Sequence, residues 1–348
     1  MTSERAAPAR QADIARKAGV SQSTVSLVLT GSGDLSRVAP ATYARVIRAA
    51  TELGYDGPIA TRPRSRRLQL GVHTFEPVFP TQAGDYYSQF LTAIEEQAAA
   101  EGCNLLLFTA LHQAGGDGRL YPEGRNELRH ASGSLLLGRS TNDEDLARLI
   151  ADRYPFVYVG ERAVDGHAVN YVGADYRSTS GEITAELLTL GHSRFAYLGE
   201  PLRTSLQTQR WEGFRDVVTR FGLTPPEPSY LAPDEISAAW LQAQRAAGVT
   251  ALLVEAASQL KVLQTLAALT GIGIPDDLSV VLLVDLPEDG PRQARWAQLT
   301  VPRPEMGRRS VQLLIQTIRN PTGDYERQVL LPCRYTLGTT VGAPRLRQ

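Results

Sequence analysis

The segment from Gln11 to Gly31, QADIARKAGVSQSTVSLVLTG, constrains the fold more than any other part of this 348-residue chain. Apolar residues recur at helical spacing on both sides of Gly19, which predicts two short helices joined by a tight turn. Glycine adopts a positive φ at such a turn without steric cost, and Ser21 can cap the second helix. The segment is therefore predicted to form a helical hairpin.

The second helix of this hairpin has a polar outer face. Val25, Val28 and Leu29 recur at the spacing of an inward face, which leaves small polar groups outside. Such groups at the start of a helix suit a surface that enters the major groove of DNA and hydrogen-bonds to base edges. A helical hairpin of another purpose is the alternative. The predicted DNA-contacting residues are Ser21, Gln22, Ser23, Thr24, Ser26 and Leu27.

A third helix is predicted over residues 40–53, PATYARVIRAATEL, and Gly54 ends it. The run DIARKAGVSQSTVSLVL followed by TYARVIRAATELGY resembles the headpiece of the lactose-repressor (LacI) family of bacterial transcription regulators. The resemblance continues more loosely to about Thr340, so it covers nearly the whole chain. It implies a regulator that binds double-stranded operator DNA.

Length and composition limit the class of protein. A chain of 348 residues exceeds what one compact core usually holds, so at least two domains are expected. No apolar run reaches the roughly 18 residues of a membrane span. The polar start MTSERAAPAR lacks the apolar core of a secretion signal. We therefore expect a cytoplasmic protein with no membrane partner.

The cysteines and histidines indicate no metal or cofactor. Cys103 and Cys333 are the only cysteines, and two distant thiols form neither a disulfide framework nor a zinc site. Buried, unreactive thiols are the better interpretation. The five histidines show no metal-ligand spacing. The chain also lacks a nucleophile elbow and a phosphate loop, so an enzyme is not expected.

The net charge of −1 conceals an asymmetry along the chain. Residues 1–67 carry 11 lysines and arginines against 5 acidic residues, whereas the remainder carries 25 against 32. A basic amino-terminal segment on an acidic body suits a protein that docks one end on phosphates.

A linker rich in arginine and proline, GPIATRPRSRR, spans residues 57–67. The LacI resemblance implies a hinge that forms a short helix on DNA and inserts a leucine into the minor groove. Here the hinge is about two residues shorter and contains Pro63, and proline inside a helix costs about 3 kcal/mol. We expect no leucine wedge. Four arginines are predicted to follow a narrow minor groove instead: Arg62, Arg64, Arg66 and Arg67.

After the linker, short apolar strands alternate with amphipathic helices, which predicts parallel sheets covered on both faces. Strands are expected at 68–72, 103–108, 134–137, 156–159, 195–198, 251–254 and 279–284. Helices are expected at 86–100, 143–151, 178–190, 211–221, 260–269 and 306–319. These are too many strands for one small sheet, so two lobes are expected. The resemblance likewise implies a bilobed core like a periplasmic sugar-binding protein, with three chain crossings between the lobes.

The predicted fold class is therefore α/β, with an all-α helix-turn-helix headpiece before a bilobed core that holds two parallel sheets. The predicted domains are a headpiece at 1–57, a hinge linker at 58–67 and an effector-binding, dimerising core at 68–348. Ligands of such sheets bind beyond the carboxyl ends of the strands, so the effector site is expected between the lobes.

Two motifs of the core carry the predicted effector contacts. QRWEGF at 209–214 matches the family pattern R-x-x-G-F, which implies that the guanidinium of Arg210 grips ligand hydroxyls or carboxylates. A surface arginine at a helix start is the alternative. Gln207 in the preceding loop adds an amide. Tyr86 and Tyr87 stand where the family commonly has two aromatics, although one of them could be an ordinary core residue.

Other family positions differ in this chain. Ala256 and Ala257 stand where the family usually has Asn-Asp, and Asp285 lies one place after the usual aspartate. Glu161 and Arg162 follow the strand at 156–159. All three are kept as predicted effector contacts: Glu161, Arg162 and Asp285. The polar residues with which the family typically binds pyranose sugars are therefore partly missing, so a sugar is only one candidate effector.

Two polar residues are predicted to have structural roles. LGHSR at 190–194 matches the family's L-G-H-x-R, and His192 is better interpreted as a satisfied polar residue after a helix than as a catalyst. Asp175 is predicted to cap the helix that follows it.

The leading hypothesis is a homodimeric transcription regulator, more plausibly a repressor, that responds to a small-molecule effector. Two headpieces on a two-fold axis would read a pseudo-palindrome. The helix at 86–100 and the late core helices are candidates for the dimer surface. One alternative is a small-molecule or sugar receptor for transport without a DNA function, which the basic headpiece disfavours. The other is an enzyme on the bilobed fold.

Overall fold

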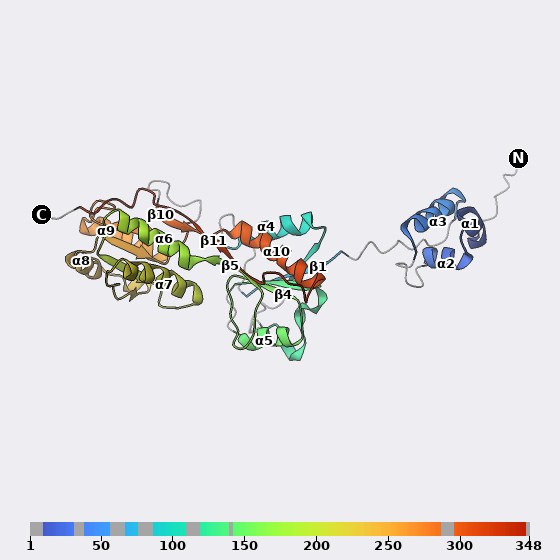
Figure 1. The fold of residues 1–348 in the computed structure, drawn as a ribbon, viewed down its shortest axis with the longest axis horizontal. Helices are drawn as coiled ribbons and strands as arrows, with labels where there is room; N and C mark the ends of the chain where they lie inside the picture. The colour runs from blue at the N-terminus through green and yellow to red at the C-terminus, as the bar shows by residue number, and fades with distance from the viewer. Residues whose placement is uncertain are drawn as a thin grey trace. The chain divides into compact units, whose positions relative to one another are not determined.

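The computed structural model describes residues 10–30, 38–55, 67–75, 86–108, 119–138, 142–286 and 296–345. The chain divides into two units, Met1–Arg67 and Leu68–Gln348, and each is described by itself (Figure 1). None of the described helices has both the length and the apolar composition needed to cross a membrane.

The first unit contains three helices around a small core. They are α1 (Gln11–Ala18), α2 (Gln22–Thr30) and α3 (Pro40–Glu52). Gly19 follows α1 with φ of 63°, a left-handed conformation that favours glycine, and its N–H bonds to the carbonyl of Ala15. The core residues come from all three helices: Ile14, Val25, Val28, Leu29, Val46 and Ala50 are all buried. The predicted helical hairpin and third helix are confirmed.

The second unit holds two six-stranded sheets. The first has the order β11-β5-β4-β3-β1-β2 and is parallel throughout its paired strands. Its strands are β1 (Gln69–Thr74), β2 (Asn104–Phe108), β3 (Gly133–Leu137), β4 (Phe156–Val159), β5 (Tyr171–Asp175) and β11 (Gln328–Pro332). Three helices belong to this lobe: α4 (Ser88–Ala100), α5 (Asp143–Ala151) and α10 (Arg303–Arg319).

The second sheet has the order β12-β10-β9-β8-β6-β7. Its strands are β6 (Phe195–Gly199), β7 (Ser229–Tyr230), β8 (Ala251–Val254), β9 (Ser279–Leu282), β10 (Ala297–Thr300) and β12 (Arg334–Thr336). Its helices are α6 (Tyr176–Thr189), α7 (Ser205–Arg220), α8 (Ala238–Ala246) and α9 (Ala257–Thr270). The expectation of two parallel sheets needs one correction, because β12 runs antiparallel to β10. The chain passes directly from β11 in the first lobe to β12, without an intervening helix, and so β12 joins the edge of the second sheet antiparallel to its neighbour.

Each sheet is covered on both faces, as its strands require. Leu135 and Leu137 of β3 pack in the core beneath α4 and α10, whereas Leu136 between them packs with Leu146 of α5. This alternation follows from the two-residue period of a strand. In the other lobe, Figure 1 shows α6 and α7 on one side of the sheet and α8 and α9 on the other.

The chain passes between the lobes three times, as the resemblance implies. The first crossing leads from β5 into α6 at Asp175, and the second leads from β10 into α10. The third joins β11 to β12 at Cys333. These crossings bring segments that are distant in the sequence beside the space between the lobes.

Several sequence-based boundaries differ from the observed ones. The helix expected at 211–221 begins six residues earlier, at Ser205, because Thr204 and Gln207 form a reciprocal cap. Its polar first turn lacks the apolar periodicity used for the prediction. The strands β5, β7, β10, β11 and β12 and the helix α8 were also not predicted. Of these, β7 and β12 span only two and three residues, which is too few for a repeating pattern to be recognised.

Candidate functional sites

The start of α2 presents an exposed polar surface. Ser21, Gln22 and Ser23 are exposed, and Thr24 and Ser26 are half-buried. Ser21 Oγ lies 2.8 Å from both Ser23 Oγ and Thr24 Oγ1 and accepts a hydrogen bond from the Thr24 N–H at 3.2 Å. The hydroxyls therefore engage one another and cap the helix, whereas no hydrogen bond within the described part of the chain engages the Gln22 amide.

The other predicted DNA contacts are only partly described. Leu27 is half-buried and packs against the headpiece core, so only part of its side chain is open to solvent. Arg67 is exposed. The remaining linker arginines, Arg62, Arg64 and Arg66, lie outside the described residues, as does the expected absence of a leucine wedge.

An ion pair connects the first and third helices of the headpiece. Lys17 Nζ lies 2.8 Å from Glu52 Oε2. The hydrogen bond and charge of Lys17 lower the pKa of the Glu52 carboxyl. Both groups are exposed, so the pair contributes little to stability.

A cavity of about 580 Å³ lies between the lobes of the second unit. This volume falls within the usual range for small-molecule sites. Residues from the first lobe and the crossings supply most of the lining, and the loop before α7 supplies the rest. The lining residues are Tyr86, Tyr87, Phe90, Leu137, Gly138, Tyr158, Val159, Gly160, Glu161, Arg162, Ala174, Tyr176, Leu202, Thr204, Ser205, Leu206 and Met306.

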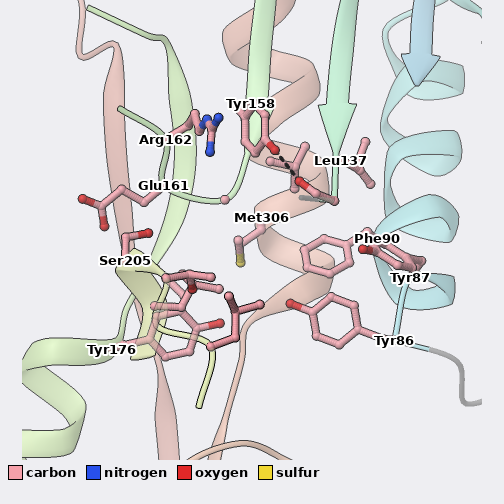
Figure 2. Close-up of a pocket in the computed structure, with 17 residues that line it drawn as sticks. Tyr86, Tyr87, Phe90, Leu137, Tyr158, Glu161, Arg162, Tyr176, Ser205 and Met306 are labelled. Carbon is pink, nitrogen blue, oxygen red and sulfur yellow. Dashed lines mark hydrogen bonds between the residues drawn. The ribbon is translucent and has the colours of Figure 1, made fainter. Parts of the chain in front are cut away.

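Aromatic rings dominate the cavity wall. Tyr86 and Tyr176 project into the cavity from opposite sides, with Met306 between them in the view of Figure 2. Tyr86 and Tyr87 make an edge-to-face contact with ring centroids 5.1 Å apart. The Tyr158 hydroxyl donates to the carbonyl of Gly138. Rings held in this way offer flat apolar faces to a ligand.

Glu161 and Arg162 are the charged residues that line the cavity. The Glu161 carboxylate accepts a hydrogen bond from Gln209 Nε2 of α7, which links the two lobes. Arg162 forms an ion pair with Asp143, and its guanidinium carbon lies 5.9 Å from the centroid of the Tyr158 ring. Part of the hydrogen-bonding capacity of each residue is therefore used within the protein.

Asp285 is paired with Arg303 at the second crossing. The two side chains make a bidentate contact, with Arg303 Nη2 2.7 Å from Asp285 Oδ1. Only 12% of the Asp285 side chain and 6% of the Arg303 side chain are exposed. The Arg303 guanidinium also lies 4.5 Å from the centroid of the Tyr86 ring. Asp285 thus acts through Arg303 on a cavity residue and does not line the cavity itself.

Gln207 and Arg210 are buried on α7. The Gln207 Oε1 atom accepts from the N–H of Thr204, and its Nε2 atom donates to Glu200 Oε2 at 2.9 Å. The Arg210 guanidinium lies 4.5 Å from the centroid of the Tyr176 ring. Burial raises the pKa of the Tyr176 phenol, so this ring stays neutral beside the cation.

The structure thus brings four of the seven predicted effector residues into the cavity lining: Tyr86, Tyr87, Glu161 and Arg162. It places Gln207, Arg210 and Asp285 just behind that lining, where they contact other residues. The sequence pattern identified these three positions. It could not show that Gln207 bonds to Thr204, that Arg210 stacks on Tyr176 or that Asp285 pairs with Arg303.

Tyr158, Tyr176 and Met306 are among the lining residues that the sequence analysis did not identify. Tyr158 lies in a buried strand and Tyr176 begins a helix, so both have the pattern of core residues. Met306 belongs to the fourth position of α10, whose start was expected three residues later. Their place in the chain could have indicated them, because each lies near the end of a predicted strand or near a crossing between the lobes.

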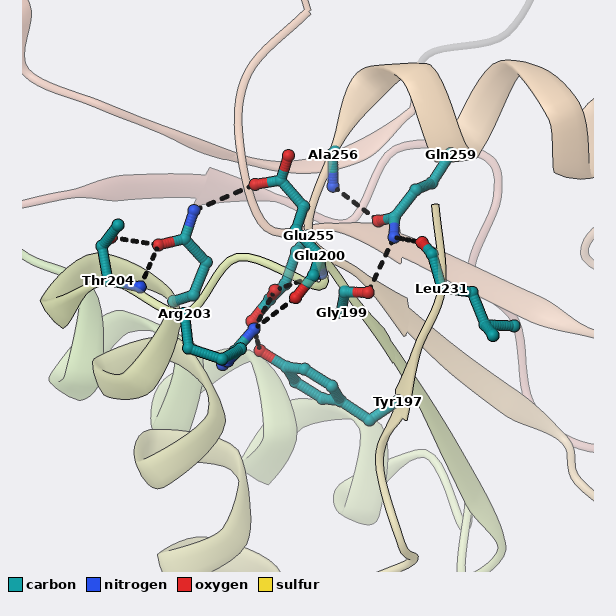
Figure 3. A network of polar contacts seen from close by, with 10 residues as sticks. Tyr197, Gly199, Glu200, Arg203, Thr204, Leu231, Glu255, Ala256 and Gln259 are labelled. Atoms are coloured by element: carbon teal, nitrogen blue, oxygen red, sulfur yellow. Dashed lines mark hydrogen bonds and ion pairs between the residues drawn. The ribbon is translucent and has the colours of Figure 1, made fainter. Parts of the chain in front are cut away.

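The second lobe contains a buried polar network that the sequence did not reveal (Figure 3). Glu255 follows β8 and is 1% exposed. It accepts hydrogen bonds from Tyr197 Oη at 2.6 Å, from the Glu200 N–H at 2.8 Å and from Arg203 Nη1 at 2.5 Å. Burial, followed by the Glu255 charge, raises the pKa of Tyr197 well above its ordinary value. Glu255 directly precedes Ala256 and Ala257, which stand where the family usually has Asn-Asp.

The predicted structural roles of His192 and Asp175 are confirmed. His192 Nδ1 lies 2.9 Å from Thr250 Oγ1, and Nε2 lies 2.9 Å from the carbonyl of Gly342. Asp175 Oδ1 accepts from the Ser178 N–H at 2.9 Å and caps α6. Within the described ranges, no group of three or more histidine, cysteine or acidic side chains is arranged to hold a metal ion.

Both cysteines are free and buried, as expected. Cys103 adjoins β2, and Cys333 lies at the third crossing. Burial raises the pKa of the Cys333 thiol to about 12 and also raises the pKa of Cys103. Thiols in this state react slowly because the thiolate is the nucleophile.

Two family models match the chain. The model for bacterial regulatory proteins of the lacI family matches residues 12–57, and the model for a periplasmic binding protein-like domain matches residues 184–341. The first match covers α1, α2 and α3, and the second covers most of the second lobe together with α10 and β11. Each match therefore agrees with the unit in which it lies.

Known proteins match over most of the chain. The HTH-type transcriptional regulator MalR of Streptomyces coelicolor is 29% identical over 96% of this chain and 97% of its own length. The maltose regulon regulatory protein MalI of Escherichia coli is 30% identical over 69% of this chain and 67% of its own length. A solved complex of the transcriptional regulator CelR with cellobiose has a TM-score of 0.61 at 24% identity and covers 96% of this chain and 100% of that one.

Helix-turn-helix geometry, a bilobed core and these matches agree with one another. The relatives are transcription regulators rather than enzymes. The chain therefore belongs to the lacI family of bacterial regulatory proteins and is a DNA-binding transcription regulator.

Proposed function

We propose that this chain is a homodimeric repressor, without enzymatic activity, that acts on DNA in the cytoplasm. A small-molecule effector bound between the lobes changes its affinity for the operator. The exposed polar start of α2 is the single observation that carries the DNA-binding part, because small side chains there allow the helix to enter the major groove. The aromatic cavity of about 580 Å³ supports the effector part.

Gln22 is the side chain proposed to read a base most directly. It is exposed, and a side-chain amide can bond to adenine with both its donor and its acceptor. Ser21, Ser23, Thr24, Ser26 and Leu27 complete the proposed contact surface. The linker arginines would add salt-dependent phosphate and minor-groove contacts.

The first lobe supplies a candidate dimer surface along α4 and the edge strand β2. Leu107 of β2 is 46% exposed, and a hollow beside it is lined by residues of both elements, including Leu91 and Glu95. An unpaired edge strand with an exposed leucine is an element that proteins usually cover. We propose that a second copy covers it and places two headpieces on a two-fold axis.

A sugar is the first effector class to test. The cavity walls carry tyrosine rings suited to stacking on the apolar face of a sugar, and the relative CelR was solved with cellobiose. Effector and operator are then coupled through lobe arrangement, and the coupling is reciprocal. If the effector weakens DNA binding, DNA must weaken effector binding by the same factor.

Fluorescence anisotropy with the DNA upstream of the chain's own gene tests the DNA-binding part. The intact chain is expected to bind this fragment with a Kd at least 1,000-fold below that for a scrambled fragment, about 4 kcal/mol of discrimination. Gln22→Ala is expected to cost about 1–3 kcal/mol on this fragment but little on the scrambled one.

Thr51→Ala provides a matched control, because Thr51 is exposed near the end of α3 and caps no part of the α2 surface. This variant is expected to bind like the parent chain. Equal binding of the two fragments by the parent chain would contradict the proposal, and so would equal losses for Gln22→Ala on both.

A further inference from the structure

The outer face of α2 carries one large apolar side chain among small polar ones. Val25, Val28 and Leu29 of this helix are fully buried in the headpiece core. Leu27 is only half-buried, and it follows the exposed Ser23 by four residues, so both lie on the same face of the helix. Part of the Leu27 side chain therefore belongs to the surface that is proposed to enter the major groove.

The polar groups near Leu27 are unequally available to a base. Ser21 Oγ lies 2.8 Å from the hydroxyl oxygens of both Ser23 and Thr24, so these three hydroxyls engage one another. Helix α2 contains no lysine or arginine, the residues that most often bind guanine in the major groove. The Gln22 amide is suited to adenine. Leu27 is thus the other large side chain on this face that can distinguish one base from another.

An apolar side chain recognises thymine through its C5-methyl group. Thymine is the only one of the four bases with a methyl group at the major-groove edge, and a leucine in contact with it removes apolar surface of both from water. The same leucine against the N4 amino group of cytosine, or against the O6 and N7 acceptors of guanine, leaves these polar groups without a partner. A leucine at this place therefore favours thymine and disfavours the other bases.

Contacts with the headpiece core hold Leu27 in place before DNA binds. Its side chain packs against the buried cluster that contains Ile14, Val28 and Val46. A side chain that is already ordered loses little conformational entropy on binding. The part of Leu27 that remains open can therefore contribute most of its contact energy to recognition of a base.

We propose that Leu27 recognises the C5-methyl group of a thymine in each operator half-site. This inference rests on the proposed entry of α2 into the major groove, and it names a chemical group that the protein reads there. Removing one such methyl group should weaken binding about fourfold, and removing one from each half-site of an operator bound by a dimer should weaken it about 16-fold.

Uracil substitution tests the proposal, because deoxyuridine differs from thymidine only in lacking the C5-methyl group. The DNA upstream of the chain's own gene is prepared with either dTTP or dUTP, and fluorescence anisotropy measures the Kd of the intact chain for each fragment. Single uracil substitutions then locate the thymines responsible. The same titrations use Leu27→Asn, which gives a polar side chain of similar size, and Leu27→Met, which keeps the side chain apolar.

Leu53→Asn provides a matched control for the stability of the headpiece. Leu53 is half-buried and packs against the same core, but it lies directly after α3 rather than on α2. Any effect of this substitution on folding should lower the affinity for both fragments by the same factor. The ratio of the two Kd values within each variant therefore isolates the methyl contact from headpiece stability.

The parent chain is expected to bind the uracil fragment about 16-fold more weakly than the thymine fragment. Leu27→Asn should lose most of this difference, whereas Leu27→Met and Leu53→Asn should retain it. Equal binding of the two fragments by a parent chain that still prefers them to scrambled DNA would overturn the inference and leave the proposed function standing. A difference that persists unchanged in Leu27→Asn would also overturn it. Failure of the parent chain to distinguish the thymine fragment from scrambled DNA would contradict the proposed function, and the inference with it.

Discussion

Gln209 of α7 donates a hydrogen bond to the Glu161 carboxylate, and this contact joins the second lobe to the first beside the effector cavity. Glu161 follows β4, and Gln209 lies 48 residues later in the sequence. The contact belongs to the lobe arrangement observed here. Its strength therefore helps to set the energy of any rearrangement of the lobes that an effector causes.

The Glu161–Gln209 contact is expected to show energetic coupling. A double-mutant cycle with Glu161→Ala and Gln209→Ala should give an interaction energy of about 1–3 kcal/mol in the free energy of unfolding, as hydrogen bonds to half-buried charges do. Chemical denaturation measures each variant. Gln242→Ala changes an exposed glutamine of α8, so its effect should add to that of Glu161→Ala. Simple additivity of the first pair would count against a structural role for this contact.

The ion pair between buried Glu255 and half-buried Arg203 is expected to be costly to break by removing the carboxylate. Glu255→Leu leaves the Arg203 charge without its carboxylate and should destabilise the chain by about 3–5 kcal/mol. The double variant with Arg203→Met removes both charges and should recover part of that loss, although Tyr197 Oη and the Glu200 N–H still lack their acceptor. Chemical denaturation of the three variants measures these differences. A double variant as unstable as Glu255→Leu would show that the network of Figure 3 depends on the hydrogen bonds from Tyr197 and Glu200 rather than on the ion pair.

The linker arginines are expected to contribute to the salt dependence of operator binding. Each arginine that neutralises a phosphate contributes about 0.9 to the slope of log affinity against log salt concentration. Replacing Arg67 alone by alanine should flatten the slope by about 1. Replacing Arg62, Arg64, Arg66 and Arg67 together should flatten it by up to about 4. Anisotropy titrations at several salt concentrations provide the slopes, and an unchanged slope in the quadruple variant would refute the proposed contacts.

Cys333 is expected to resist alkylation in the folded protein. Burial raises its thiol pKa to about 12, so almost no thiolate is present at pH 8. In the unfolded chain the pKa returns toward its ordinary value, and the unfolded state releases its proton first as the pH rises. The stability linked to this thiol is therefore full below pH 8 and declines between about pH 9 and 12.

Iodoacetamide labelling followed by mass spectrometry measures this difference. Cys333 in the native chain should react at least 100-fold more slowly at pH 8 than in urea. Cys103, whose pKa burial also raises, should be protected in the same direction. Equal rates in the folded and unfolded chain would contradict the buried environment of these cysteines.

The headpiece was predictable from sequence because its determinants are local. Gly19 has the left-handed conformation expected of it, and Ser21 caps α2 as predicted. Val25, Val28 and Leu29 face the core because helical spacing alone decides which side of a helix they occupy. The Asp175 cap in the core was recognised for the same reason: its partner is the nearby Ser178 N–H.

The cavity was only partly predictable because its geometry depends on contacts between distant segments. Tyr86 and Glu161 were identified by position, and they do line it. Arg210 was identified too, but only the fold places Tyr176 against its guanidinium. Pairing of Asp285 with Arg303 likewise requires the second crossing, where residues 18 positions apart meet.

Local patterns in this sequence therefore determined the three headpiece helices, most of the core helices, seven strands, and the caps at Ser21 and Asp175. These features depend on backbone conformation and on neighbours within a few positions. Tertiary structure decided which charged groups around the cavity pair with each other and which side chains line it. The physical reason is that burial and ion pairing arise where chain crossings bring remote residues together, and no local period in the sequence records that meeting.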